Sequence, residues 1–298
     1  MSTAGPSGLG KRLLSQGLPP QRATVQKYVL DPVKLIAIPI TNKRIFLYHK
    51  HSSEILNMNS RIVRYETRIT EKARKIWSKL EKSPREINQK LVRMVNSQLD
   101  KTPWTEDSLN TVPSEGYILK TVMENQESRN LTYQEWFKNV DKLDVRPVCM
   151  YYPQSVMSER AVREQLKSLW DHGLNYHKKQ MWLSILGLPL TLPVVLVPVV
   201  PNVPGFYLLY RAYRNFKAFC GAKHLKSLVE NKSHKLVFTD LPQFSDILRS
   251  ETEIPEEHLV LNEKNLERVL DMLQIHELRA PLEKAVLQER KRLDGHRK

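Results

Sequence analysis

The chain has 298 residues, of which 27% are charged, and its formal net charge at pH 7 is +15. A hydrophobic fraction of 41% and a mean hydropathy of −0.46 exclude a polytopic membrane protein in which most residues face lipid. Two cysteines, Cys149 and Cys220, are too few for a disulfide framework. Composition therefore predicts a mainly water-facing body whose basic excess favours an anionic partner, such as a lipid surface or nucleic acid.

The N-terminal segment, residues 1–30, contains basic residues and no acid. Ser, Thr and Arg without Asp or Glu are typical of a mitochondrial transit peptide, although several Gly and Pro residues oppose a regular amphipathic helix. We therefore predict a disordered segment with a mitochondrial targeting role. Disorder without a targeting role is the alternative.

Residues 31–153 are predicted to form a soluble α+β part. It begins with two apolar runs between Lys34 and Lys50, separated by turn-forming residues, which predict a β-hairpin. Pro39 is expected to place the first strand at a sheet edge. Apolar stripes at helical spacing then predict a pair of helices near 60–82 and 84–100.

The rest of this part, residues 102–145, is acidic and is predicted to be largely irregular. Within it, Thr132 and Glu135 have the spacing of a capping box and predict a short helix from Tyr133. A further strand is expected near 145–152.

Residues 154–235 contain the most informative feature of the chain. A long helix is predicted from Ser158, and it runs into the segment Met181–Tyr210, which contains no charged residue. Because this run exceeds the roughly 18 residues that a bilayer-spanning helix needs and has basic flanks, it predicts a membrane element. The following aromatic and basic residues, to Lys226, would lie at the membrane interface.

Prolines within the apolar run leave three arrangements open, because each proline removes a backbone donor that a lipid-facing helix needs. The basic flanks at both ends favour a hairpin that enters and leaves the membrane on one side. The alternatives are a kinked single span and a Pro-rich element buried in protein. The side chains predicted to enter the membrane are Trp182, Leu186, Pro189, Pro193, Pro198, Pro201, Pro204, Phe206, Tyr207 and Tyr210. Those predicted to meet lipid head groups are Lys178, Lys179, Arg211, Arg214, Lys217 and Lys223.

Residues 236–298 are predicted to form a C-terminal helical tail. A loop is expected at Phe238–Phe244, followed by one helix with Leu266, Val269, Leu270 and Leu273 on a face and another that begins near Pro281. The predicted fold class is therefore mostly α, with a small β-hairpin element, amphipathic helices and one Pro-rich membrane-inserted hairpin.

Sequence motifs of catalysis are absent. The chain has no nucleotide-binding, metalloprotease, serine-hydrolase or paired-cysteine motif, so we expect neither an enzyme nor a bound cofactor. Cys220 and His224 lie four residues apart, but two ligands do not make a metal site. His49 and His51, near a predicted strand end, are expected to be solvated.

Three segments resemble a fungal family named mitochondrial potassium–proton exchange-related. They are Lys34–Tyr48, Val148–Pro153, and the run PNVPGFYLLYRAYRNFKAFCG that begins at Pro201. The resemblance extends over about Lys34 to Leu228. It implies an inner-membrane protein, with its bulk facing the matrix, that is linked to matrix cation and volume homeostasis. It supplies no transport site.

Three functions follow as expectations. The first is a membrane-embedded component or regulator of mitochondrial potassium–proton exchange, which must oligomerise or join other membrane subunits because one hairpin cannot enclose an ion path. The second is a scaffold or tether that binds or shapes membrane rich in anionic lipid such as cardiolipin, without transport. The third is nucleic-acid binding through the basic helices at 60–101, and it is the least favoured because a charged helix face is usually only solvated.

Overall fold

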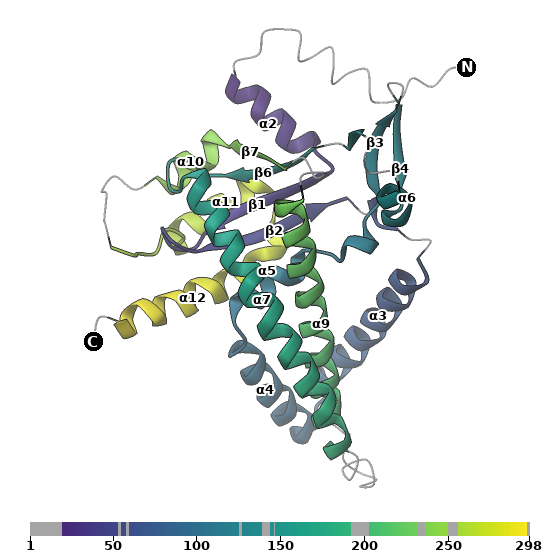
Figure 1. The fold of residues 1–298 in the computed structure, drawn as a ribbon. Helices are drawn as coiled ribbons and strands as arrows, with labels where there is room; N and C mark the ends of the chain where they lie inside the picture. The colour runs from purple at the N-terminus through teal and green to yellow at the C-terminus, as the bar shows by residue number, and fades with distance from the viewer. Residues whose placement is uncertain are drawn as a thin grey trace.

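A four-stranded sheet lies at the centre of the protein, as the computed structural model in Figure 1 shows. The structure describes residues 20–52, 55–57, 60–124, 127–138, 144–145, 147–191, 203–231, 236–249 and 256–296. The strands of the central sheet follow the order β2-β1-β6-β7. Their bounds are Val33–Pro39 (β1), Ile45–His51 (β2), Val148–Tyr152 (β6) and Leu236–Asp240 (β7).

The β-hairpin predicted at 34–50 is confirmed, since β1 and β2 pair antiparallel from Val33 with His51 to Pro39 with Ile45. The prediction that Pro39 marks an edge strand is wrong, because β1 also pairs in parallel with β6. Pro39 is tolerated there because it ends the strand, past the last β1–β6 residue pair, Ile36 with Tyr151.

Helices cover both faces of the central sheet, so the protein has three layers. Successive side chains of a strand point to opposite faces: Leu35 and Ala37 of β1 belong to one apolar cluster, and Ile36 and Ile38 to the other. The first cluster includes residues of α5 (Trp104–Thr111), α7 (Glu159–Gly187) and α9 (Val203–Glu230). The second includes residues of α10 (Pro242–Leu248), α11 (Glu263–Leu273) and α12 (Arg279–His296). The protein is mostly helical as predicted, but its β part is larger than the small hairpin expected.

The region from 102 to 145 is more regular than its acidic composition suggested. It contains α5, then a small antiparallel sheet of β3 (Lys120–Glu124), β4 (Glu127–Leu131) and β5 (Asp144–Val145), and α6 (Tyr133–Lys138). The predicted capping box of α6 is confirmed: the Thr132 backbone N–H donates to Glu135 Oε2 at 2.8 Å, and the Glu135 N–H donates to Thr132 Oγ1 at 3.3 Å.

Three further helices complete the fold. The predicted helix pair corresponds to α3 (Arg61–Glu81) and α4 (Glu86–Asp100). Residues 20–30, which were expected to be disordered, form α2 (Pro20–Leu30) instead. Buried Tyr28 fixes this helix by donating a hydrogen bond to the Leu273 carbonyl at 2.6 Å. The targeting signal predicted before residue 20 lies outside the described residues.

The C-terminal region is part of the body. The predicted loop at 238–244 is wrong, because β7 and α10 occupy these residues, and β7 pairs in parallel with β6. The apolar face predicted for α11 is confirmed, since Leu266, Val269, Leu270 and Leu273 are all buried. The last helix starts at Arg279, two residues before the expected Pro281.

Candidate functional site: the α7–α9 hairpin and the ion pairs at its base

The long helix α7 begins with a cap at Ser158, where the sequence predicts its start, and it buries a stripe of apolar side chains. The Ser158 hydroxyl accepts a hydrogen bond from the Ala161 N–H at 3.3 Å, which satisfies one of the unpaired donors of the first turn. Val162, Leu166 and Trp170 are buried against the sheet. The helix ends at Gly187 and continues as a short 3-10 turn, Leu188–Thr191.

The chain reverses direction between Thr191 and Val203, so that α7 and α9 pack together as an antiparallel pair that projects away from the sheet (Figure 1). Gly187 lies against Leu208 across this pair: a Cβ at position 187 would sit 3.1 Å from Leu208 Cδ1. A hairpin therefore describes the chain path, and the kinked single span is wrong. Residues 192–202, with Pro193, Pro198 and Pro201, lie outside the described residues.

Large apolar side chains are exposed at the end of this hairpin that is remote from the sheet. Leu186 is 69% exposed, Leu190 82% and Phe206 64%, which argues against a Pro-rich element buried in protein, the third arrangement considered. Of the residues predicted to enter a membrane, Trp182, Pro189, Pro204 and Tyr210 are also exposed, whereas Tyr207 is half-buried. We use the name hairpin tip for the exposed apolar residues Trp182, Leu183, Ile185, Leu186, Leu190, Phe206, Leu209 and Tyr210.

Exposed apolar side chains do not by themselves make a helix able to span a membrane. Among the residues that the structure describes, no helix combines the length and apolar character needed to cross a bilayer. The helices α7 and α9 each carry charged residues over the half that packs on the sheet. Only their remote ends are free of charge.

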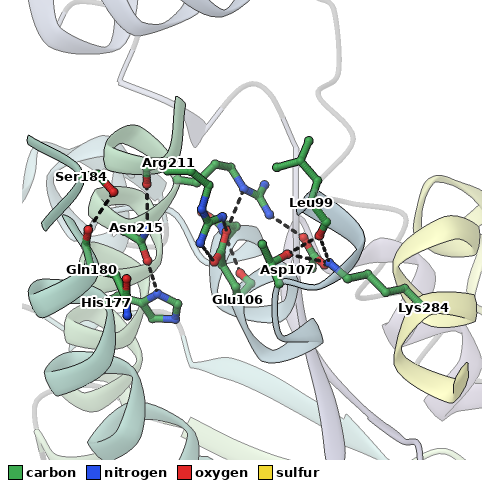
Figure 2. A network of polar contacts seen from close by, with 12 residues as sticks. Leu99, Glu106, Asp107, His177, Gln180, Ser184, Arg211, Asn215 and Lys284 are labelled. Carbon is green, nitrogen blue, oxygen red and sulfur yellow. Dashed lines mark hydrogen bonds and ion pairs between the residues drawn. The ribbon is translucent and has the colours of Figure 1, made fainter. Parts of the chain in front are cut away.

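The basic residues predicted to meet lipid head groups divide into two sets. Lys178, Lys179 and Lys223 are exposed. Arg211 is only 9% exposed, and its guanidinium donates to both oxygens of Glu106, at 2.7 and 2.8 Å (Figure 2). The head-group role is therefore wrong for Arg211, because its charge is already neutralised inside the protein.

Arg214 is the second of these basic residues whose charge is paired inside the protein. Its Nε donates to Glu106 at 3.3 Å, and its terminal nitrogen pairs with Asp107. Lys284 of α12 donates to the other oxygen of Asp107 at 2.9 Å and to the Leu99 carbonyl at the end of α4 at 3.2 Å. The two acids of α5 therefore connect the hairpin to α12 and α4.

Electrostatics favour the ionised form of Glu106. Burial by itself would raise the pKa of this carboxyl, but the hydrogen bonds and charge of Arg211, together with the charge of Arg214, lower the pKa below its usual value of 4.5. A bidentate Arg–carboxylate pair is the strongest form of such contacts. Glu106 therefore stays charged at neutral pH and fixes α9 against α5.

A neutral polar chain extends this network along the hairpin. His177 Nδ1 lies 2.8 Å from Asn215 Oδ1, and the Asn215 amide donates to the Arg211 carbonyl at 2.7 Å (Figure 2). Burial lowers the pKa of His177 below 6.5, although its bond to Asn215 opposes the shift. Sequence reasoning missed Glu106, Asp107 and Asn215, because their partners are remote in the chain.

The histidines of β2 also differ from their prediction. His49 is buried rather than solvated, and His51 is half-buried. Their Nδ1 atoms lie 3.2 Å apart, and His224 lies behind His49 with a ring-centroid separation of 6.3 Å. Over the described part of the chain, no three His, Cys, Asp or Glu residues are arranged to hold a metal ion.

The fold and site together define a three-layer α/β protein with a projecting helical hairpin. The family model described as mitochondrial K+-H+ exchange-related matches residues 34–229, and the chain belongs to this family. This confirms the resemblance seen in the sequence. The family name links these proteins to mitochondria and to potassium–proton exchange.

Two fungal relatives match over most of the chain. Uncharacterized protein YDL183C of Saccharomyces cerevisiae is 45% identical over 287 residues, which cover 91% of this chain and 89% of the relative. Uncharacterized protein C23H3.12c of Schizosaccharomyces pombe is 31% identical over 193 residues, which cover 65% of this chain and 74% of the relative. No solved structure matches the chain.

Proposed function

We propose that this protein is a membrane-docked component or regulator of mitochondrial potassium–proton exchange, with no catalytic step of its own. In this proposal the hairpin tip inserts into the inner membrane from the matrix side, and the α/β body remains in water. The observation that carries the proposal is the cluster of exposed apolar side chains at the hairpin tip, since soluble monomers rarely expose such a patch.

Shallow insertion fits the geometry better than a full span. The exposed apolar residues of the hairpin tip lie at the remote ends of α7 and α9, whose other ends pack against the sheet. Burying a Leu or Phe side chain is favourable by about 1.5–3 kcal/mol. Lys178 and Lys179, exposed just before the hairpin tip, would each add about 1 kcal/mol of attraction to an anionic lipid surface. Ion movement across the membrane then requires other membrane subunits or further copies.

The aromatic and basic residues of α9 support docking only in part. Arg211 and Arg214 form ion pairs with Glu106 and Asp107, and Ala218 and Leu225 face the core. A scaffold that lays all of α9 among head groups therefore conflicts with its packing. Docking through the hairpin tip alone is compatible with the packing of α9.

Vesicle flotation tests the proposal. The substitutions Leu186→Glu and Phe206→Glu place charges on two largely exposed positions, so the fold is retained while insertion is opposed. We expect the wild-type chain to float with phosphatidylcholine vesicles that contain cardiolipin, and the double variant to bind at least about tenfold more weakly. Leu287→Glu, at an exposed position of α12, is the matched control and should float like the wild type. Equal flotation of the wild type and the hairpin-tip variant would refute the docking role.

A further inference from the structure

A pocket of about 570 Å³ is lined by residues of β2, α3, α5 and α9. This volume is within the range of sites that bind small molecules. Aromatic residues line part of the pocket: Tyr117 before β3, and Tyr213 and Phe216 on α9. Such walls suit a ligand with a flat apolar body.

The floor of the pocket holds the His49–His51 pair. The two residues alternate along β2 and so share one face of the strand. With Nδ1 atoms 3.2 Å apart, one ring donates and the other accepts. The pair can take up one further proton and keep this bond, because the ring that gains it donates while its neighbour accepts. A second added proton would place two N–H groups against each other.

The groups that face this pair are mostly basic. Burial lowers the pKa of His49 well below 6.5, and the neighbouring His51, His224 and Lys120 lower it further. Burial also lowers the pKa of His51, with an added contribution from Lys217. The other titratable groups around the pocket are Glu71, which is exposed, Cys220, and Glu115, which lies 3.9 Å from Lys120 Nζ.

A lysine, Lys217, lines the pocket. It is half-buried in the α9 wall, and of the residues that the structure describes, none offers it a carboxylate within 4.0 Å. The carboxylate of Glu71 is exposed, so water and salt screen it more than they screen groups on the floor. Among the described residues that line the pocket, Glu71 therefore carries the one carboxylate, and it lies with a lysine and a pair of imidazoles that can offer N–H groups.

We propose that this pocket binds a small organic anion with a flat apolar body, and that binding is coupled to the uptake of one proton by the His49–His51 pair. The acid group of the ligand lies beside Lys217 and His51, and its body lies against the aromatic wall. The anion supplies the charge that stabilises the protonated pair, so affinity rises as pH falls. This site is independent of membrane docking through the hairpin tip.

Calorimetric titration of the purified full-length protein tests the inference. The probe is benzenesulfonate, which stays anionic from pH 5.5 to 8, so that any pH dependence comes from the protein. Benzenesulfonamide is its uncharged counterpart. We expect benzenesulfonate to bind several-fold more tightly at pH 5.5 than at pH 8, with uptake of at most one proton. We expect benzenesulfonamide to bind weakly at both values.

Three variants assign the effect to the pocket. Lys217→Met should weaken benzenesulfonate binding by about tenfold, whereas Lys223→Met, at an exposed position of the same helix outside the pocket, should not change it. His51→Asn should remove the pH dependence of benzenesulfonate binding. Equal binding of the two probes, affinity that does not change with pH, or full binding by Lys217→Met would each overturn the proposal.

Discussion

Glu106 is the residue on which the placement of the hairpin depends most. It is 1% exposed, and its two oxygens accept from Arg211, while Arg214 reaches the same carboxylate. A buried ion pair of this kind is weak evidence for net stability, because removing two charges from water is costly. Removing one partner of the pair is destabilising, because the remaining charge is then buried without an opposite charge beside it.

The substitution Glu106→Gln should therefore lower the free energy of unfolding by about 3–5 kcal/mol. Glutamine has nearly the same shape as glutamate, so the change isolates the charge, and Arg211 loses the carboxylate that pairs with it. Urea unfolding followed by circular dichroism measures the difference. Glu86→Gln, which removes an exposed pair with Lys90 on α4, is the control and should change stability by less than about 0.5 kcal/mol. A similar loss in both variants would show that the buried pair has no special role.

Acid should remove the same contribution. The pKa of Glu106 is lower in the folded protein than its ordinary value of 4.5, so the pair stabilises the fold fully above about pH 4.5, and this contribution is lost as pH falls through the folded pKa. The difference in unfolding free energy between wild type and Glu106→Gln should accordingly shrink below pH 4.5. Unfolding curves collected from pH 6 to pH 3 measure this. A difference that stays constant over that range would contradict the assignment.

At the scale of elements, close packing of α9 on α5 explains a small residue in the middle of a long helix. A Cβ at Gly221 would lie 2.2 Å from the Leu109 carbonyl oxygen and 2.8 Å from that of Val112. Both are backbone atoms at the end of α5, so they cannot move aside as a side chain could. Gly221 therefore sets the distance between the two helices.

Gly221→Ala should destabilise the protein by about 1–3 kcal/mol, because overpacking outweighs the roughly 1 kcal/mol that alanine gains over glycine inside a helix. Gly295→Ala in α12 is the matched control, since a Cβ there meets nothing within 4 Å. This second change should be neutral or slightly stabilising. Thermal unfolding of both variants tests the contrast, and a stabilised Gly221→Ala protein would show that α5 and α9 do not pack this closely.

Elements with a strong local pattern could be predicted from the sequence. The start of α7 at Ser158, the capping box of α6 and the apolar face of α11 are examples. Strand β7 was missed because its pairing with β6 depends on a segment far away in the chain. The ion pairs of α5 could not be predicted, because Glu106 and Arg211 are separated by 105 residues and nothing local connects them. The hairpin tip was foreseen because an uncharged run is a local signal.

For the whole molecule, α9 joins the two parts that the proposed function requires. Its first turns carry Phe206 and Leu209 of the hairpin tip, and its last turns bury Leu225 and Leu228 against the sheet. The α/β body is thereby fixed rigidly to the element proposed to enter the membrane. A change in lipid contact at the hairpin tip would act on the body through α7 and α9 and through the ion pairs of Glu106 and Asp107.

Potassium-acetate swelling of isolated mitochondria tests the central claim most directly. Mitochondria that lack the protein should swell more slowly than those of the parent strain, because swelling in this salt requires exchange of potassium for protons. Re-expression of the wild-type chain should restore the rate, whereas the Leu186→Glu, Phe206→Glu variant, expressed at the same level, should not. Normal swelling without the protein would contradict its role in exchange, and full rescue by the variant would contradict docking through the hairpin tip.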